Sequence, residues 1–519
     1  MSLPGAERGE DADIPWLPAV TGSTRTLAAA SGASFVGAVF SAVSGMLFIV
    51  VLGRVLGTTG AGVVLQAIGV FTIALGVAKL GLDTTAVWLL PRTRGDDPAV
   101  IRGVVRGLAG VGFVTGVLVA VAVAVAVPIL LPTEGSAEVV HAVQAMAWFL
   151  PASVVTTVGL AATRGLGGIG PYTVIGNIVV PGLRPVLSLA LGALGGGILA
   201  VATAWAAVLA AAAVPVAYVL FRQIRGIEVG ERVQRPRPLD RPLVVRAARF
   251  SLPRALSSGI ELAQQWLDVV VVGALAGPAA AGIYGAATRF IGAGMVPSTS
   301  MRLVVAPQFS SALHRGDRGQ AQGVYRRTAS WVVLLSTPIY VLLSLYGGTV
   351  LSVLGPGFAV GAPLLAVLSV GATVFFMTGN VQSVLLMSGR SGWVAANKAI
   401  VLVVLVVGLL ALVPRVGVIG AAVAWSLATS VDALLASLQV SSRVGIRLEP
   451  RSILLALAVA GVPFLLTGGG LRLWLGDTAP ALILGAMGGT LLLLPVCWWA
   501  RRPLELEGVF RLLRRRGNG

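Results

Sequence analysis

A few charged side chains lie inside long apolar stretches of this sequence, where an unpaired charge is costly. Arg254, Glu261 and Asp268 follow one another at intervals of seven residues, so in a helix they share one face. Asp268 and Arg289 lie at similar depths in successive apolar stretches and could pair. Such residues form either a gate or coupling site, or a fixed structural salt bridge, and the sequence leaves both open.

Arg184 lies near the middle of another apolar stretch, flanked by Pro181, Gly182 and Pro185. Prolines there loosen a helix and free backbone carbonyls, which a membrane protein tolerates only beside a protein-lined cavity. The planar guanidinium fork can bind two phosphate oxygens at once. Arg184 is therefore a candidate ligand for an anionic, phosphate-bearing substrate.

The elements that must position these residues are membrane-spanning helices. Hydrophobic residues make up 56% of the 519 residues, charged residues 11%, and mean hydropathy is +0.92. Many uncharged runs exceed the roughly 20 residues that cross a bilayer, where only helices satisfy the backbone. The sequence predicts an all-α polytopic membrane protein of about fourteen transmembrane helices: 27–52, 63–90, 104–131, 139–162, 171–195, 198–221, 251–276, 282–310, 329–353, 363–388, 398–413, 416–440, 452–471 and 478–500.

The net charge of +18 follows from topology and does not indicate nucleic-acid binding. If the N-terminus is cytoplasmic, 30 of the 38 lysines and arginines lie in or at the edges of the tails and inner loops. Outer loops hold three: Arg54, Arg415 and Arg472. This bias predicts cytoplasmic termini, and basic loops that contact membrane lipids. The Arg-rich, Ala- and Gly-rich composition suggests a bacterial protein of the plasma membrane.

Metal and redox chemistry find no support in the sequence. His141 and His314 stand alone, without nearby carboxylate or cysteine clusters, so no metal site is expected. The single cysteine, Cys497, excludes intrachain disulfides. We expect no cofactor.

The chain is predicted to be an internal duplication with an offset of 220 residues. Asn177 falls on Asn397, and Ala204-Trp205 falls on Ala424-Trp425. Six spans separate equivalent points, so the halves share one membrane orientation, as in transporters that bind substrate between parallel repeats. The predicted parts are a cytoplasmic tail (1–26), an N-lobe of helices 1–6 (27–221), a basic cytoplasmic linker (222–250), a C-lobe of helices 7–12 (251–440), helices 13–14 (452–500) and a basic tail (501–519).

This organisation resembles the multidrug/oligosaccharidyl-lipid/polysaccharide exporter superfamily, and within it the polysaccharide-transport branch. The local resemblance is best in Ser251-Leu252-Pro253, in Trp266-Leu267-Asp268 with the apolar run to Gly273, and in Gly282-Ile283-Tyr284 with the run to Arg289. It covers residues 27 to about 500, and its motifs are degenerate. An extra helix pair follows the two six-helix lobes.

The resemblance implies a flippase or exporter, not an enzyme. Its substrate would be a lipid-linked oligosaccharide or polysaccharide precursor on a polyprenyl pyrophosphate, moved by alternating access. Arg184 and Arg289 would bind the pyrophosphate, and Arg302 and Lys79 would add to a cationic vestibule, although Lys79 could instead pair locally with Asp83. Glycosyltransferases and a polysaccharide polymerase are candidate partners.

A cation-coupled multidrug extruder of the same superfamily is the alternative function. Glu261 favours it. The uncharged first helix and the absence of an acid in 360–388 count against it.

Overall fold

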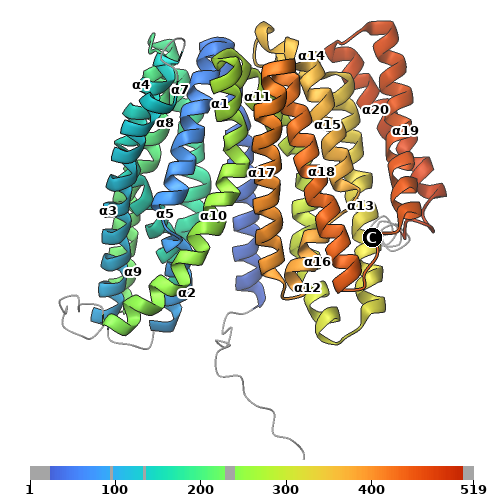
Figure 1. Ribbon diagram of the computed structural model, residues 1–519. Helices are drawn as coiled ribbons and strands as arrows, with labels where there is room; N and C mark the ends of the chain where they lie inside the picture. The colour runs from blue at the N-terminus through green and yellow to red at the C-terminus, as the bar shows by residue number, and fades with distance from the viewer. Residues whose placement is uncertain (1–23, 94–97, 132–135, 228–239, 506–519) are drawn as a thin grey trace, which may run out of the picture.

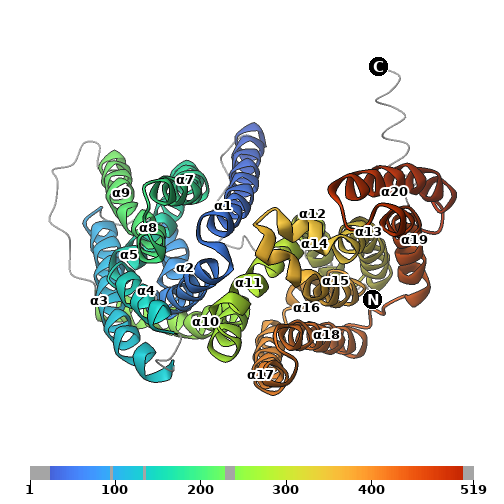
Figure 2. The same ribbon diagram turned by 90° about the horizontal axis from the view of Figure 1, so that it is seen from above.

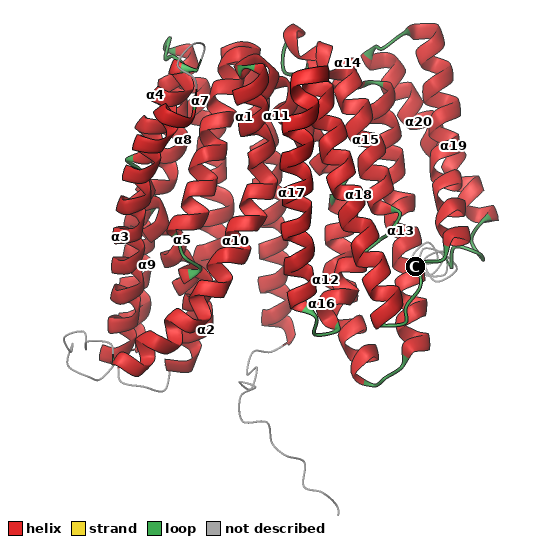
Figure 3. Cartoon of the chain, viewed as in Figure 1, coloured by secondary structure: helices red, strands yellow, loops and turns green. Residues whose placement is uncertain are grey.

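The computed structural model describes residues 24–93, 98–131, 136–227 and 240–505, and every regular element in them is helical (Figure 3). Most of both predicted tails, and residues 228–239 of the predicted linker, lie outside the described residues. The elements are α1 (Thr24–Ala78), α2 (Leu82–Leu89), η1 (Leu90–Thr93), α3 (Pro98–Leu130), α4 (Ala137–Ala147), α5 (Leu150–Gly165), α6 (Ile169–Pro171), η2 (Tyr172–Val179), α7 (Val180–Ala193), α8 (Ile198–Ala211), α9 (Ala213–Ile227), α10 (Arg241–Ala276), α11 (Pro278–Ala293), α12 (Val296–His314), α13 (Arg318–Leu345), α14 (Gly347–Ser352), η3 (Pro356–Gly361), α15 (Ala362–Phe376), α16 (Val381–Met387), α17 (Ser391–Val416), α18 (Val418–Arg443), α19 (Pro450–Leu475) and α20 (Ala479–Trp499).

Within the described residues, eleven helices are long and apolar enough to cross a membrane, or twelve if α4 and α5, bent by 54°, form one span. The prediction of an all-α polytopic membrane fold is confirmed. The lower number arises because α1 holds the first two predicted spans and because the eighth is divided between α11 and α12. The protein is a multi-pass membrane protein.

Helix α1 is a hairpin of two arms that meet at Gly57. Gly57 has φ 66° and ψ −169°, a conformation open to glycine but strained for other residues. Ile49 and Leu65 line the same cavity, although in a straight helix they would lie about 24 Å apart. Gly277, 220 residues later, separates α10 from α11 with φ 88° and ψ 166°. This pair of turns supports the duplication, while superposition of Asn177 on Asn397 remains a prediction.

Seen from above, the helices form two groups (Figure 2). Helices α1 to α9 make one group and α12 to α20 the other, with α10 and α11 between them. The α1 helix packs against α7, α10 and α11, so it connects the groups. The predicted linker ends earlier than expected: residues 241–250 are already the first turns of α10, with Pro242 in its first turn.

We call one end of the bundle the basic end: it carries α2, α12 and α16 and lies at the bottom of Figure 1. Arg92, Arg315 and Arg390 lie on or beside these elements. Arg54 and Arg415 instead lie within three residues of the glycine turns at Gly57 and Gly417, at the other end. The arginine bias thus has a spatial counterpart, and assignment of the basic end to the cytoplasm remains a prediction.

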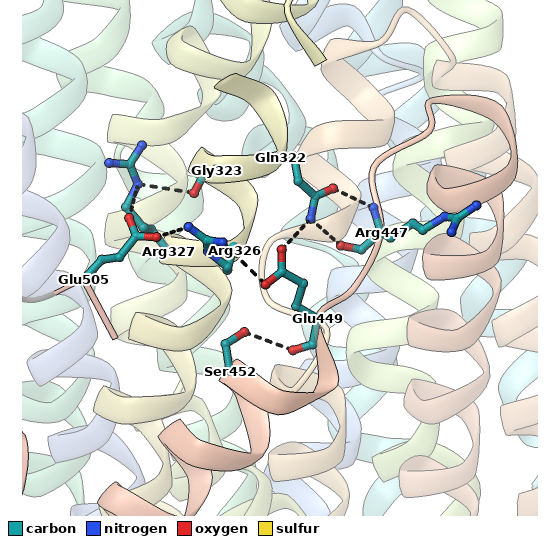
Figure 4. A network of polar contacts seen from close by, with 8 residues as sticks. All are labelled: Gln322, Gly323, Arg326, Arg327, Arg447, Glu449, Ser452 and Glu505. Atoms are coloured by element: carbon teal, nitrogen blue, oxygen red, sulfur yellow. Dashed lines mark hydrogen bonds and ion pairs between the residues drawn. The ribbon is translucent and has the colours of Figure 1, made fainter. Parts of the chain in front are cut away.

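The C-terminal pair α19–α20 is fastened to α13 near the basic end and to α14 at the other end. Near the basic end, Arg326 contacts Glu449 and Glu505, and Arg327 contacts Glu505 (Figure 4). At the other end, the Asp477 carboxylate accepts hydrogen bonds from the first backbone N–H groups of α14, at 3.0 and 3.1 Å. A carboxylate favours this position because free N–H groups and the positive end of the helix dipole meet there. These contacts hold α19–α20 to the rest of the second group of helices.

Candidate functional site

A cavity of about 250 Å³ lies between the first group of helices and the α10–α11 pair, and the two predicted substrate-binding arginines line it. Both arms of α1 contribute apolar walls. The polar and aromatic lining comes from Arg184 on α7, Trp205 on α8, Trp266 on α10 and Arg289 on α11. Gly45 leaves open space where a side chain would project. We call this the central cavity; no aspartate or glutamate occurs among the described residues that line it.

Arg184 lies against an aromatic ring, on a helix that follows an irregular segment. Its guanidinium carbon lies 3.7 Å from the centre of the Trp205 ring, and Trp205 in turn packs edge-on against Phe71. The Nε atom of Arg184 is buried without a hydrogen-bond partner. Residues Tyr172–Val179 form a π-helix directly before α7, whereas the turns of α7 that hold Arg184 and the prolines predicted to loosen them are regular α-helix.

Arg289 repeats this arrangement on the other side of the cavity. Its guanidinium carbon lies 4.0 Å from the centre of the Trp266 ring, one helix away. A guanidinium stacked on an indole keeps its full charge, because the ring supplies only a quadrupole. Two positive charges therefore face one cavity, each oriented by a tryptophan.

Asp268 does not form the predicted ion pair with Arg289. One carboxylate oxygen accepts a hydrogen bond from the Tyr284 hydroxyl at 2.9 Å, and the other from the Val269 backbone N–H at 2.8 Å. Asp268 is buried between α10 and α11. The sequence did not reveal that the Tyr284 hydroxyl donates a hydrogen bond to this carboxylate.

Glu261 and Arg254 line a second, larger cavity of about 520 Å³ between α10 and α17. Lys398 also lines it. Of the three residues predicted to share a face of this helix, Arg254 and Glu261 line the second cavity and Asp268 does not.

An ion pair that sequence reasoning missed lies behind this second cavity. The Lys398 Nζ is 2.8 Å from Asp432 Oδ2, which also accepts a hydrogen bond from Gln382 at 2.5 Å. Gln264 donates to the Lys398 backbone carbonyl at 2.8 Å. The available signal was a lone aspartate and a lone lysine in apolar helices, 34 residues apart.

Lys79 and Arg302 are not brought to the central cavity. Lys79, in the turn between α1 and α2, forms an ion pair with Asp83 at 2.8 Å, which is the local pairing that the sequence left open. Arg302 is exposed on α12. Neither belongs to the residues that line the central cavity.

Comparison with solved structures identifies the class of fold. The chain is similar to "Lipid II flippase MurJ, inward closed conformation", with TM-score 0.68 and 11% identity over 90% of this chain and 98% of that one. It is also similar to the "Inward-facing conformation of a multidrug resistance MATE family transporter of the MOP superfamily", with TM-score 0.62 and 16% identity over 78% and 94%. No curated protein matches the chain by sequence. The fold is that of MOP superfamily transporters.

Residues 27–313 match the family described as "Polysaccharide biosynthesis protein". The match spans more than half of the chain, so this protein belongs to that family. The superfamily and branch predicted from the repeat and its motifs are confirmed.

Proposed function

We propose that this protein is a flippase or exporter that moves a polyprenyl-pyrophosphate-linked oligosaccharide or polysaccharide precursor across the bacterial plasma membrane. The family and the fold support a transporter that serves polysaccharide synthesis. The observation that carries the proposal is the central cavity, with Arg184 and Arg289 oriented by Trp205 and Trp266 and no carboxylate in its described lining.

The charge of the cavity selects the substrate class. A pyrophosphate needs positive compensation to cross an apolar core, and two guanidinium groups supply it with directional donors. The buried, unpartnered Nε of Arg184 is one donor that such a ligand would satisfy. A cationic drug would instead be repelled by both arginines, which disfavours the multidrug alternative.

Alternating access would occur by rocking of the two groups of helices about α1, which contacts both. Asp268 bonds α10 to α11 through Tyr284. Glu261 and Arg254 line the second cavity, beside the first turns of α17. We assign these three residues to gating or coupling.

The glycan-synthesising enzymes, glycosyltransferases and a polymerase, would supply and receive the substrate.

Transport in proteoliposomes tests the proposal. A fluorescent polyprenyl-pyrophosphate oligosaccharide should become accessible to an external lectin only when the protein is present, while ethidium should not be extruded. Ethidium extrusion without glycan translocation would overturn the proposal in favour of the multidrug alternative.

A matched pair of glycine variants tests whether the central cavity is the route. Gly45 and Gly110 are both helical glycines with open space in front of an added side chain, but only Gly45 lines the cavity. Gly45→Leu should block glycan translocation, and Gly110→Leu should leave it intact. Equal activity of the two variants would exclude this cavity as the route.

A further inference from the structure

An apolar groove of about 400 Å³ lies between α3 and α9 and is floored by α5. Helices α3 and α9 lie at the outer edge of the first group, far from the second group (Figure 2). The groove is therefore separate from the central cavity, and the proposed transport function gives it no role.

The lining changes character along the groove. Val105, Leu108, Val158, Val216 and Leu220 are among the residues that make the walls apolar. Its only charged lining residues among those described are Arg102 and Arg106, both in the first turns of α3. Arg106 is exposed and Arg102 half-buried.

The facing helix adds positive charge at the same end. Arg222 and Arg225 are exposed in the last turns of α9. The guanidinium of Arg225 lies 4.4 Å from the ring centre of Phe221, which lines the groove. Both α3 and α9 have these turns at the basic end (Figure 1).

The groove also has the direction and length of a lipid chain. Ile224 lines it near the basic end of α9 and Ala213 at the start of α9. The two residues are separated by about 16 Å of helix, or half the thickness of the hydrocarbon core. A molecule that fits has a negative headgroup at the arginines and an apolar chain that reaches toward the bilayer centre.

We propose that this groove binds one anionic glycerophospholipid of the leaflet at the basic end, with its phosphate on Arg102 and Arg106 and an acyl chain between α3 and α9. Juxtamembrane arginines attract anionic headgroups by about 1 kcal/mol each. The site holds a membrane lipid as a ligand of the first group of helices, outside the transport route.

Native mass spectrometry of the full-length protein, titrated with phosphatidylglycerol or with phosphatidylcholine of identical chains, measures this binding. Wild-type protein should bind phosphatidylglycerol more tightly than phosphatidylcholine. The Arg102→Gln/Arg106→Gln variant should lose that preference, with about thirtyfold weaker phosphatidylglycerol binding and unchanged phosphatidylcholine binding. The exposed pair Arg443→Gln/Arg451→Gln in the second group is the matched control and should bind as wild type.

A groove-filling variant separates this site from general attraction to the surface. Ala217 lines the groove and is exposed, so the larger side chain of Ala217→Phe should fill the groove. This variant should weaken the binding of both phosphatidylglycerol and phosphatidylcholine. Val214→Phe, also exposed on α9 but outside the lining, should have no effect.

Three results would overturn the proposal. The first is phosphatidylglycerol binding that neither the arginine nor the Ala217 variant changes. The second is competition by undecaprenyl phosphate at equal concentration, which would assign the groove to the carrier. The third is a protein dimer that Ala217→Phe dissociates, which would make the groove a protein interface.

Discussion

Arginines occur in two contrasting environments in this protein. In the central cavity, Arg184 and Arg289 lie on tryptophan rings. On α13, Arg326 and Arg327 contact the carboxylates of the C-terminal part of the chain (Figure 4). A ring orients a guanidinium without neutralising it, whereas a carboxylate does both. The cavity thus keeps positive charge for a mobile anion, and the α13 network uses its charge to fasten α19–α20.

The Lys398–Asp432 ion pair shows a third environment for a positive side chain in this protein. Its carboxylate side chain is only 5% exposed, and that of the lysine 26%. A buried charge that loses its partner is strongly destabilising, even where the intact pair adds little net stability. This pair therefore constrains the structure in a way that the half-exposed α13 network does not.

The largest expected effect is on transport, from removal of the cavity charge. Arg184→Ala should abolish flipping in the proteoliposome assay while leaving folded protein in the membrane. Arg184→Lys should restore it only partly, because an ammonium lacks the bidentate fork. Arg327→Ala, a change of the same kind in the α13 network, should retain transport. Full transport by the Arg184→Ala/Arg289→Ala double variant would eliminate the substrate role and make both charges structural.

The second effect is on stability, from breaking the Lys398–Asp432 pair. Lys398→Met should destabilise the protein by about 3 kcal/mol, because it leaves the Asp432 carboxylate buried with Gln382 alone. The Lys398→Met/Asp432→Asn double variant should recover most of the loss. Arg327→Met, which removes one half-exposed partner of Glu505, should cost only about 0.5 kcal/mol. Thermal unfolding in detergent measures all three, and an equal loss for Lys398→Met and Arg327→Met would refute the distinction.

Much of the fold followed from the sequence because it depends on bilayer physics and repetition. Apolar length fixes where helices can be, and two glycine turns, at Gly57 and Gly277, lie at the predicted 220-residue offset. The breaks inside spans, such as the bend between α4 and α5, escaped this reasoning. Such breaks depend on neighbours packed against the helix, which hydropathy does not report.

The site was predicted in part for a similar physical reason. Depth in an apolar span located Arg184 and Arg289, since a charge there needs a protein environment. Their partners could not be inferred, because Trp205 and Trp266 lie on different helices from the arginines they contact. The same gap explains why Asp268 was expected to contact Arg289 when its hydrogen bond goes to Tyr284.

A smaller effect should follow from removing the tryptophan rings. Trp205→Leu should slow flipping about tenfold, because a desolvated cation–π contact contributes roughly 1–2 kcal/mol to holding Arg184 in position. Trp205→Phe should retain most of the rate. Trp474, which is 91% exposed, offers a control, and Trp474→Leu should leave the rate unchanged. If Trp205→Phe were as slow as Trp205→Leu, indole size and not the aromatic face would be responsible.

The smallest effect should come from the α13 network. Glu505→Gln removes the carboxylate that Arg326 and Arg327 share, yet these side chains are 31% to 45% exposed. Ion pairs at such exposure contribute about 0–1 kcal/mol and are screened at physiological salt, where the Debye length is about 8 Å. The α19–α20 pair should stay in place, because Trp331 still donates to the Leu504 carbonyl and Asp477 still caps α14. Thermal unfolding measures the stability difference between Glu505→Gln and wild type. This difference should be smaller at high salt than at low salt. A loss of several kcal/mol that salt does not reduce would show that this network is structurally equivalent to the buried Lys398–Asp432 pair, and the contrast drawn between them would fail.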